Sequence, residues 1–424
     1  MQLDKHLITF SSYLLCLIPL SLLTGPFLPD LFVSIISLTF LFIVIKKKIW
    51  NYFFSKFFVI FLIFYLYLIL ISLSSEYPLI SLESSLFYFR FGLFSLAVWF
   101  LLDNNFRLMK LFTYTFLFTF CFAIFDGYYQ YIYSESTFGF NSLSPTRMTL
   151  PLNDSMILGG YISRIFPFLF GLMIFIFPRS KLTILITCLL LILADVLVYI
   201  SGERTALGLL FITTVIIIFV ISQFKFLRII TFMLSLAIII FITLSDTAIR
   251  HRNIDKTIDQ MNLISEDSNS QIRLFSPVHE SMFKSAFIMF KDNKLFGVGP
   301  KLFRIYCSDE KYNINSDSCN THPHNTYVQL SAETGLIGII FVGSLFLFLS
   351  FKLIMHMYLK FFFREVSISD INLCLIICFI LSLWPFLPTQ SFFNNWINII
   401  YFLPVGFYLY LNNSMQKDLK VNKH

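Results

Sequence analysis

The stretch KLTILITCLLLILADVLVYISGERTALGLLFITTVIIIFVI, residues 181–221, decides the fold class of this chain. It holds two apolar runs, each long enough to cross a bilayer as a helix, with only the polar segment SGER between them. A turn this short predicts that the two spans form a hairpin. The composition agrees, since 57% of the 424 residues are hydrophobic and 13% are charged, whereas about a quarter are charged in a soluble protein. Most of the surface is therefore expected to face lipid.

Similar apolar windows recur along the chain and predict twelve transmembrane helices. They lie at 7–24, 30–45, 56–74, 79–102, 107–133, 155–177, 181–200, 203–221, 226–244, 326–350, 369–388 and 393–412. The first window has no small-residue cleavage site after it, so we interpret it as a span and not as a signal peptide. Residues 1–244 then hold nine spans, 245–325 form one large loop, and 326–424 hold the last three spans and a tail.

The basic residues indicate the orientation of these spans. Of the 31 Lys and Arg residues, 17 fall in alternate connections that are cytoplasmic if both termini are inside. The opposite connections TGPFLPD, SSEYP and LPTQSFFNN contain none. The pattern therefore predicts cytoplasmic termini and places the large loop, 245–325, on the outer side.

The large loop has two further features. Cys307 and Cys319 lie in it and, in an oxidising compartment, form a candidate disulfide. A metal pair is less favoured, because no CxxC motif or nearby Cys/His tetrad accompanies them. Residues 276–294 place apolar side chains at helical spacing and predict an amphipathic helix. That helix lies either on the membrane surface or against the rest of the loop.

Four arginines belong neither to the cytoplasmic connections nor to the large loop. They are Arg90, Arg147, Arg164 and Arg204. A charge at mid-span costs about 2.5 kcal/mol or more, so such a residue pairs or binds a ligand. The candidate acidic partners are Glu83, which lies two helical turns before Arg90, Asp126, Asp195, and Glu203, which is adjacent to Arg204. Because the outer side should be poor in positive charge, several arginines there indicate an anionic ligand, and guanidinium groups match phosphate oxygens.

The segment THPHNTYVQLSAETGLIG, residues 321–338, leads into the tenth predicted span. His324 lies at the water boundary, where an imidazole can accept a proton at neutral pH. Gly335 and Gly338 are three residues apart and predict close approach of another helix. A lone histidine at an interface is also typical of an anchor. A catalytic role is favoured here because this histidine faces the same compartment as the surplus arginines.

The sequence resembles the O-antigen ligase family and its relatives among bacterial polysaccharide polymerases. His324 and Asn325, followed after nine residues by Gly335 and then by Gly338, resemble that family's signature. The segment SGERTALG resembles its short Ser/Arg segment. Residues 271–303, with Arg273, the GVG motif at 297–299 and Phe303, resemble its outer-loop segment before the histidine.

The resemblance implies a GT-C-like membrane glycosyltransferase that needs no metal or other cofactor. Such an enzyme moves a glycan from undecaprenyl pyrophosphate to a lipid A-core acceptor at the periplasmic side of the bacterial cytoplasmic membrane. By position, Arg204 and Arg273 match pyrophosphate-binding arginines, and His324 matches the essential histidine, which we expect to act as the base. Arg147 and Arg164 join the expected binding set on topology. The expected partners are the lipid-linked donor, the glycan acceptor and membrane lipid, but no nucleic acid.

Two alternatives remain open at this point. A polymerase that joins lipid-linked repeat units would share donor and mechanism and differ in its acceptor; the His-Asn form and the short loop 134–154 favour the ligase. A transporter of the same lipid-linked sugar would show repeated halves, and 1–212 does not resemble 213–424. The sequence assigns no role to Arg90 or His322.

Overall fold

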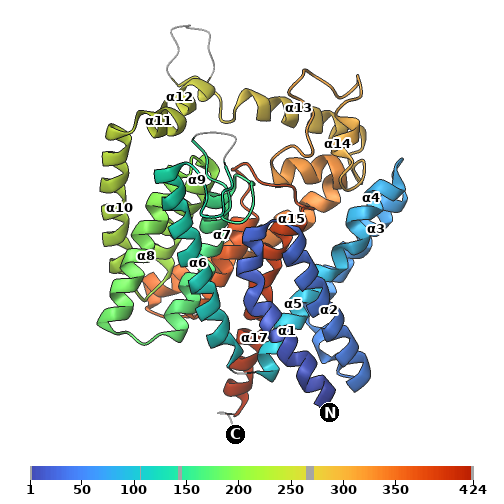
Figure 1. Cartoon of the computed structure of the whole chain (residues 1–424). Helices are drawn as coiled ribbons and strands as arrows, with labels where there is room; N and C mark the ends of the chain where they lie inside the picture. The colour runs from blue at the N-terminus through green and yellow to red at the C-terminus, as the bar shows by residue number, and fades with distance from the viewer. Residues whose placement is uncertain (1, 106, 142–145, 264–271, 422–424) are drawn as a thin grey trace.

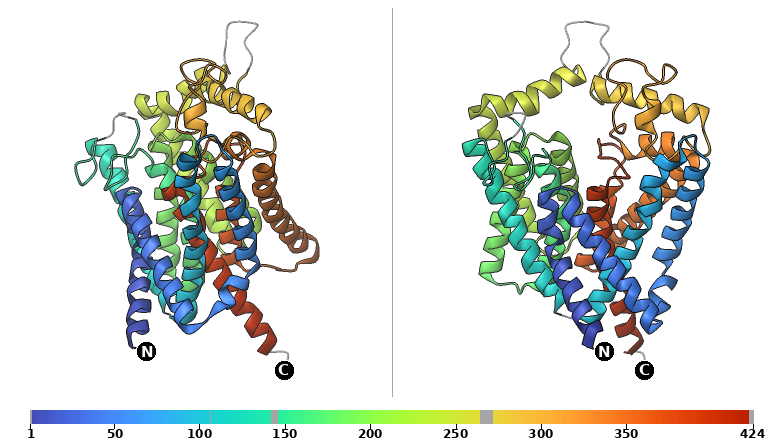
Figure 2. Two further views of the ribbon diagram at one scale, coloured as in Figure 1. Left: turned by 90° about the vertical axis from the view of Figure 1, so that its right-hand side faces the viewer. Right: turned by 45° about the vertical axis from the view of Figure 1, so that its right-hand side comes forward.

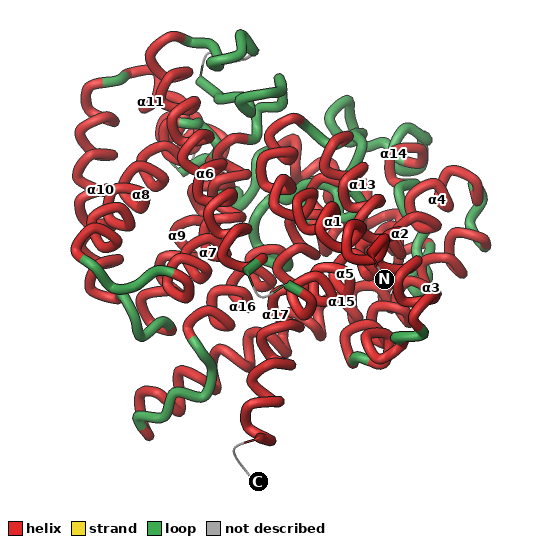
Figure 3. The backbone as a smooth tube through the Cα atoms, turned by 60° about the horizontal axis from the view of Figure 1, so that its bottom comes forward, coloured by secondary structure: helices red, strands yellow, loops and turns green. Residues whose placement is uncertain are grey.

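The fold is built from helices. The computed structural model describes residues 2–105, 107–141, 146–263 and 272–421, and this part of the chain contains no β-strand (Figure 3). The helices before the large loop are α1 Gln2–Ser21, α2 Phe27–Lys47, α3 Lys56–Leu73, α4 Pro78–Ser85, α5 Phe89–Asn104, α6 Leu108–Tyr133, α7 Leu158–Ile176, α8 Lys181–Ile200, α9 Arg204–Val220 and α10 Lys225–Ser245. The helices within it and after it are α11 Thr247–Arg250, α12 Lys256–Met261, α13 Pro277–Asp292, α14 Phe303–Tyr306, α15 Thr326–Tyr358, α16 Asp370–Ser382 and α17 Asn395–Val421.

Most of these helices are long and apolar enough to cross a membrane. Among the described residues there are nine such spans, with α4 and α5 counted together as one. Helices α9 and α16 are also apolar but have only 17 and 13 residues. The chain is therefore an all-helical integral membrane protein, while the number of twelve spans stays a prediction.

Two helix pairs form the centre of the bundle. Helix α17 packs along α5, and α16 packs along α7. In the spans that contain α5 and α7, 78% of the most apolar window is buried, against 17% in α10 and 22% in α15. The two chain ends lie at one end of the bundle, and α11 to α14 lie across the other (Figures 1 and 2). We call that second end the loop end.

The sequence suggests Glu83 as the partner of Arg90, but the structure gives this arginine a different acidic partner. It donates instead to Asp30 of α2, through Nε at 2.9 Å and Nη2 at 3.2 Å. The chain changes from α-helix to a 3₁₀ turn at Leu86–Tyr88, so the spacing between Glu83 and Arg90 is not that of a continuous α-helix. The two-armed contact holds the start of α5 against α2.

Asp195 also has a partner that the sequence did not indicate. It pairs with Arg228, one of the 17 basic residues assigned from the sequence to cytoplasmic connections, which lies within α10 and is fully buried. Nη1 and Nη2 reach the two carboxylate oxygens at 2.8 and 2.9 Å, Thr214 of α9 accepts from Nη2, and Ser235 donates to Asp195. Nε of Arg228 is buried without a hydrogen-bond partner among the described residues. Removing either member of such a buried pair would leave the other charge uncompensated. The pair ties α8, α9 and α10 together.

Asp126, a third predicted arginine partner, instead organises the connection after α6. It accepts hydrogen bonds from the backbone N and Oγ1 of Thr137 at 2.7 and 2.6 Å and from Nε2 of Gln130 at 2.6 Å. The same Gln130 amide exchanges hydrogen bonds at 3.0 Å with the backbone of Thr149. Two buried side chains of α6 therefore fix the connection that carries Arg147.

Helix α13 is the amphipathic helix predicted at 276–294, and of its two predicted settings the structure shows packing on the protein. Met282, Ala286 and Met289 are buried in a cluster with Phe303 and Ala332. This cluster joins α13 to α14 and to the first turns of α15. The loop end is thus a packed layer with its own small core.

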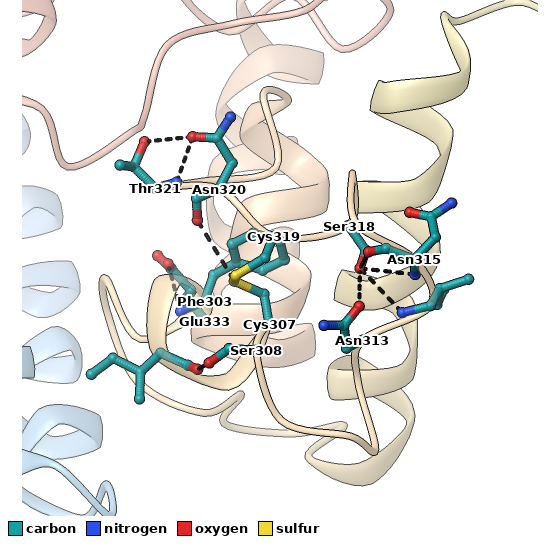
Figure 4. Close-up of a disulfide and its surroundings, with 12 residues drawn as sticks. Phe303, Cys307, Ser308, Asn313, Asn315, Ser318, Cys319, Asn320, Thr321 and Glu333 are labelled. Atoms are coloured by element: carbon teal, nitrogen blue, oxygen red, sulfur yellow. Dashed lines mark hydrogen bonds between the residues drawn. A yellow bond between two sulfur atoms is a disulfide. The ribbon is translucent and has the colours of Figure 1, made fainter.

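A disulfide closes the segment that follows α14. Cys307 and Cys319, 12 residues apart, are joined in the structure, as Figure 4 shows. Beside them, the backbone N of Phe303 donates to the Glu333 carboxylate of α15 at 3.2 Å. The closed segment is thereby anchored to the helix that follows the histidines.

Helix α15 is broken at Gly335, whose backbone has φ 63° and ψ −162°. The freed groups pair with the segment 294–299. Leu336 N donates to Lys294 O at 2.8 Å, and Val298 N and Gly299 N donate to the carbonyls of residues 332 and 333 at 2.8 and 2.9 Å. Backbone groups at membrane depth need such partners, so the break and the segment require one another.

This break corrects the prediction that Gly335 and Gly338 admit a neighbouring helix. A Cβ on Gly335 would lie 2.4 Å from the carbonyl of Leu295, so the close neighbour is the loop segment. A Cβ on Gly338 would lie 1.9 Å from Oγ1 of Thr334, within the same helix. Gly297, from the GVG motif, approaches the backbone of α15 just as closely.

Candidate active site

Asn325 fixes the point where α15 begins. Its side-chain oxygen accepts from the backbone N of Tyr327 and Val328 at 2.9 and 3.1 Å, which caps the helix. Its Nδ2 donates to Pro385 O at 2.8 Å, which ties the helix start to the segment before α17. In the structure the asparagine of the signature therefore positions the chain.

The preceding residue, His324, is held in a strained conformation. Its φ is 54°, a left-handed value that costs a residue other than glycine of order 1 kcal/mol. The backbone N of Thr389 donates to the carbonyl of His324 at 2.8 Å, and the next residue, Asn325, caps the helix. The backbone of His324 is therefore held in place. Strain of this kind persists where the surroundings fix it, and it clusters at functional sites.

Three histidine rings gather here. The ring centroid of His324 lies 4.1 Å from that of His322 and 5.5 Å from that of His279 on α13. His322 has both ring nitrogens engaged, with Oγ1 of Thr321 at 3.0 Å and the carbonyl of Thr389 at 3.3 Å. The Nε2 of His324 has a weaker contact, 3.4 Å from Nδ2 of Asn320. Of His322 and His324, His324 therefore has the ring with fewer hydrogen bonds.

The surroundings keep these imidazoles neutral. Burial, with a smaller effect from the charge of His279, lowers the pKa of His324 to about 4. Burial, followed by the charge of His324, lowers the pKa of His322 to about 3. At neutral pH both rings are therefore unprotonated, which is the form that accepts a proton.

Arg204 is not paired with the adjacent Glu203. Its guanidinium donates to Oγ1 of Thr257 at 2.9 Å and to Oε1 of Gln260 at 2.7 Å, both on α12. These are neutral partners, so the contacts orient the side chain without cancelling its charge. Burial lowers the pKa of His279, and the charge of Arg204 lowers it further, which places this arginine within electrostatic reach of His279.

Glu203 lies among the other arginines. Its carboxylate accepts from the backbone N of Gly159 and Gly160 at 2.7 and 3.1 Å, at the start of α7, where the helix dipole favours a negative charge. Burial raises the pKa of Glu203 to about 7, against the lowering effect of the charges of Arg147 and Arg164. Arg147 donates to the carbonyl of Met156 at 2.6 Å, and Arg164 donates to that of Gly160 at 3.1 Å.

Arg252 joins this group, although the sequence analysis did not single it out. Its Nε donates to Gly202 O at 3.1 Å, and it interacts electrostatically with Arg204, Arg147 and Glu203. Arg147, Arg164 and Arg252 thus interact with Glu203, and Arg204 joins them through its interaction with Arg252. We define the arginine cluster by its members Arg147, Arg164, Arg204 and Arg252. Its net positive charge matches an anionic ligand.

Arg273 lies at the edge of this arrangement. Its backbone N donates to Met261 O at 2.9 Å, and its Nε lies 3.8 Å from the Glu280 carboxylate, which follows His279 on α13. The structure therefore brings Arg147, Arg164 and Arg204 together and leaves Arg273 with an acidic neighbour. No group of three His, Cys, Asp or Glu side chains suited to a metal occurs in the described residues.

Two residues of the site were missed from the sequence, His279 and Arg252. His279 lies within the segment that resembled the family's outer-loop segment, so its histidine was a usable signal. Arg252 is one of ten basic residues in the large loop, and its sequence neighbours do not set it apart.

The fold and site define a helical integral membrane protein with histidines and an arginine cluster at its loop end. Residues 186–343 match the family model described as O-antigen ligase, a range that contains Arg204, Arg252, Arg273, His279 and His324. This match supports the resemblance to the O-antigen ligase family over that part of the chain. No curated protein matches the chain.

Proposed function

We propose that the protein is a GT-C-type O-antigen ligase that transfers a glycan from undecaprenyl pyrophosphate to a lipid A-core acceptor. The observation that supports this most strongly is the placement of His279. Its ring contacts that of His324, and its pKa is lowered by burial and by the charge of Arg204. A neutral base and an arginine-rich surface therefore adjoin one another, as transfer from a pyrophosphate donor requires.

In the proposed reaction the acceptor hydroxyl attacks the anomeric carbon of the donor sugar. The new C–O bond forms as the bond from that carbon to the pyrophosphate oxygen breaks, and the electron pair leaves with the pyrophosphate. The hydroxyl proton passes to His324. Guanidinium groups of the arginine cluster stabilise the charge that develops on the phosphate oxygens. One displacement inverts the anomeric centre, and arginine supplies the positive charge that a metal would otherwise supply.

We place the site in the periplasm, with both termini in the cytoplasm and the protein in the bacterial inner membrane. The distribution of basic residues supports this orientation, and 245–325 is then the periplasmic loop. An impermeant thiol reagent added to intact cells should label Glu135→Cys, on the exposed connection after α6, but not Asn51→Cys. The opposite labelling pattern would overturn the orientation and the proposed function with it.

The reaction itself is tested with purified full-length protein and an undecaprenyl-pyrophosphate glycan donor. We expect transfer to lipid A-core that persists in excess EDTA and is lost in His324→Ala. His251→Ala is the matched control, because this histidine also lies at the loop end but its side chain is 63% exposed. Transfer to a second lipid-linked glycan in place of lipid A-core would identify a polymerase. Loss of transfer on chelation, restored by a divalent ion, would refute the metal-independent mechanism.

A further inference from the structure

A cavity of about 310 Å³ lies at the end of the bundle opposite the candidate active site. Its walls come from the last turns of α15, the segment before α16, the first turn of α16 and the C-terminal half of α17. This is the end at which both chain termini lie (Figure 1). Neither His324 nor the arginine cluster contributes to it, so the proposed reaction leaves the cavity without a role.

The polar side chains of this cavity favour an anion. Lys352 supplies a positive charge, and its Nζ has a neutral partner, the hydroxyl of Tyr408 at 3.3 Å. Of the described residues that line the cavity, none is acidic. The nearest carboxylate in sequence, Asp370, accepts from the backbone N of Ser222 and Gln223 at 3.1 and 2.9 Å and is not part of the lining.

Two further polar side chains belong to the wall of the cavity. Oγ of Ser369, at the start of α16, is closed to solvent and makes no capping bond. His356 is fully buried, and its Nδ1 lies 3.1 Å from Oγ of Ser367. Ser367 is exposed and lines the cavity, so its hydroxyl is available to a ligand there.

The rim of the cavity is apolar and faces outward. Phe351 and Met355 of α15 line it and are 60% and 38% exposed. Phe348 and Ile354, on the same stretch of α15, are also exposed. In a membrane-spanning helix such side chains contact acyl chains. A charged, hydrogen-bonding interior beside a lipid-facing rim has the two chemistries of a phospholipid.

We propose that this cavity binds the phosphate-bearing headgroup of an anionic membrane phospholipid. Lys352 and the hydroxyl of Ser367 would contact the phosphate, and the acyl chains would lie along Phe351 and Met355. A free phosphate ion could use the polar groups but would gain nothing from the apolar rim.

The proposal is tested by native mass spectrometry of the full-length protein in detergent. We expect phosphatidylglycerol to bind more tightly than phosphatidylcholine. Lys352→Ala should weaken phosphatidylglycerol binding about tenfold or more, since a charged hydrogen bond contributes about 1.5–3 kcal/mol, and Lys352→Arg should largely retain it. The matched control is Arg364→Ala, which removes one exposed positive charge near the same end of α15 and does not line the cavity.

Three outcomes would overturn the proposal. Equal binding of both lipids would show that charge plays no part. Unchanged phosphatidylglycerol binding in Lys352→Ala, or an equal loss in Arg364→Ala, would place the lipid elsewhere. Competition by inorganic phosphate at concentrations similar to those of the lipid would assign the cavity to a small soluble anion instead.

Discussion

Replacing Gly335 by alanine should disrupt the break in α15. The residue's φ of 63° with ψ of −162° lies in a region open almost only to glycine, and forcing another residue into it costs about 1–3 kcal/mol. The new Cβ would also lie 2.4 Å from the Leu295 carbonyl and 2.6 Å from Phe296 N, so the segment must move away. That movement threatens three backbone hydrogen bonds of 2.8–2.9 Å, each contributing about 0.5–1.5 kcal/mol.

The expected sum is a destabilisation of about 2.5–7.5 kcal/mol. Gly343→Ala is the matched control within the same helix, because the nearest atom to its Cβ would be Cε1 of Tyr327 at 3.8 Å. Alanine there should be neutral or stabilise by up to about 1 kcal/mol. The measurement is chemical unfolding of both variants in detergent, followed by tryptophan fluorescence. If Gly335→Ala unfolds within about 1 kcal/mol of Gly343→Ala, the break does not depend on glycine and the reasoning fails.

The remaining predictions concern the site and the disulfide. His324→Ala should reduce transfer about 10²–10⁴-fold with donor binding kept. Because the His324 pKa is lowered to about 4, wild-type kcat/KM should fall only as the pH drops toward 4, and His279→Ala should move the fall to higher pH; a wild-type fall centred near 6.5 would contradict this. Arg204→Ala should abolish transfer and Arg204→Lys restore part of it, since lysine lacks the planar fork; full activity of the alanine variant would refute a role in binding the donor. Cys307→Ser, Cys319→Ser and the double variant should each destabilise by about 2–4 kcal/mol, and thiol labelling of both cysteines in native protein would exclude the bond.

Features that depend on residues close together in the sequence could be predicted from it. Apolar length predicted the spans, and 3.6-residue spacing predicted α13. The motif also pointed to the start of α15, where Asn325 caps the helix. Each of these patterns involves only residues of one helix or of the segment at its end.

Contacts between distant segments could not be predicted in this way. The spacing of Glu83 and Arg90 suggested a pair, but a 3₁₀ turn intervenes and Asp30 lies on another helix. The prediction that Gly335 and Gly338 admit another helix was wrong, because Gly335 approaches a loop segment and Gly338 approaches Thr334 of its own helix. The spacing of glycines does not identify what lies against them. His279 reaches His324 only because α13 packs across α15.

The buried pair of Asp195 and Arg228 has a consequence for how the protein enters the membrane. The two charges lie on α8 and α10, so α8 emerges from the ribosome with an unpaired carboxylate, and its partner follows two helices later. An isolated charge at mid-membrane costs about 2.5–3.5 kcal/mol, whereas the paired arrangement gives each charge a partner of opposite sign. Release of α8 into lipid is therefore expected to wait for α10. The three helices should leave the insertion machinery as one unit, and a chain truncated after α9 should be retained there or degraded.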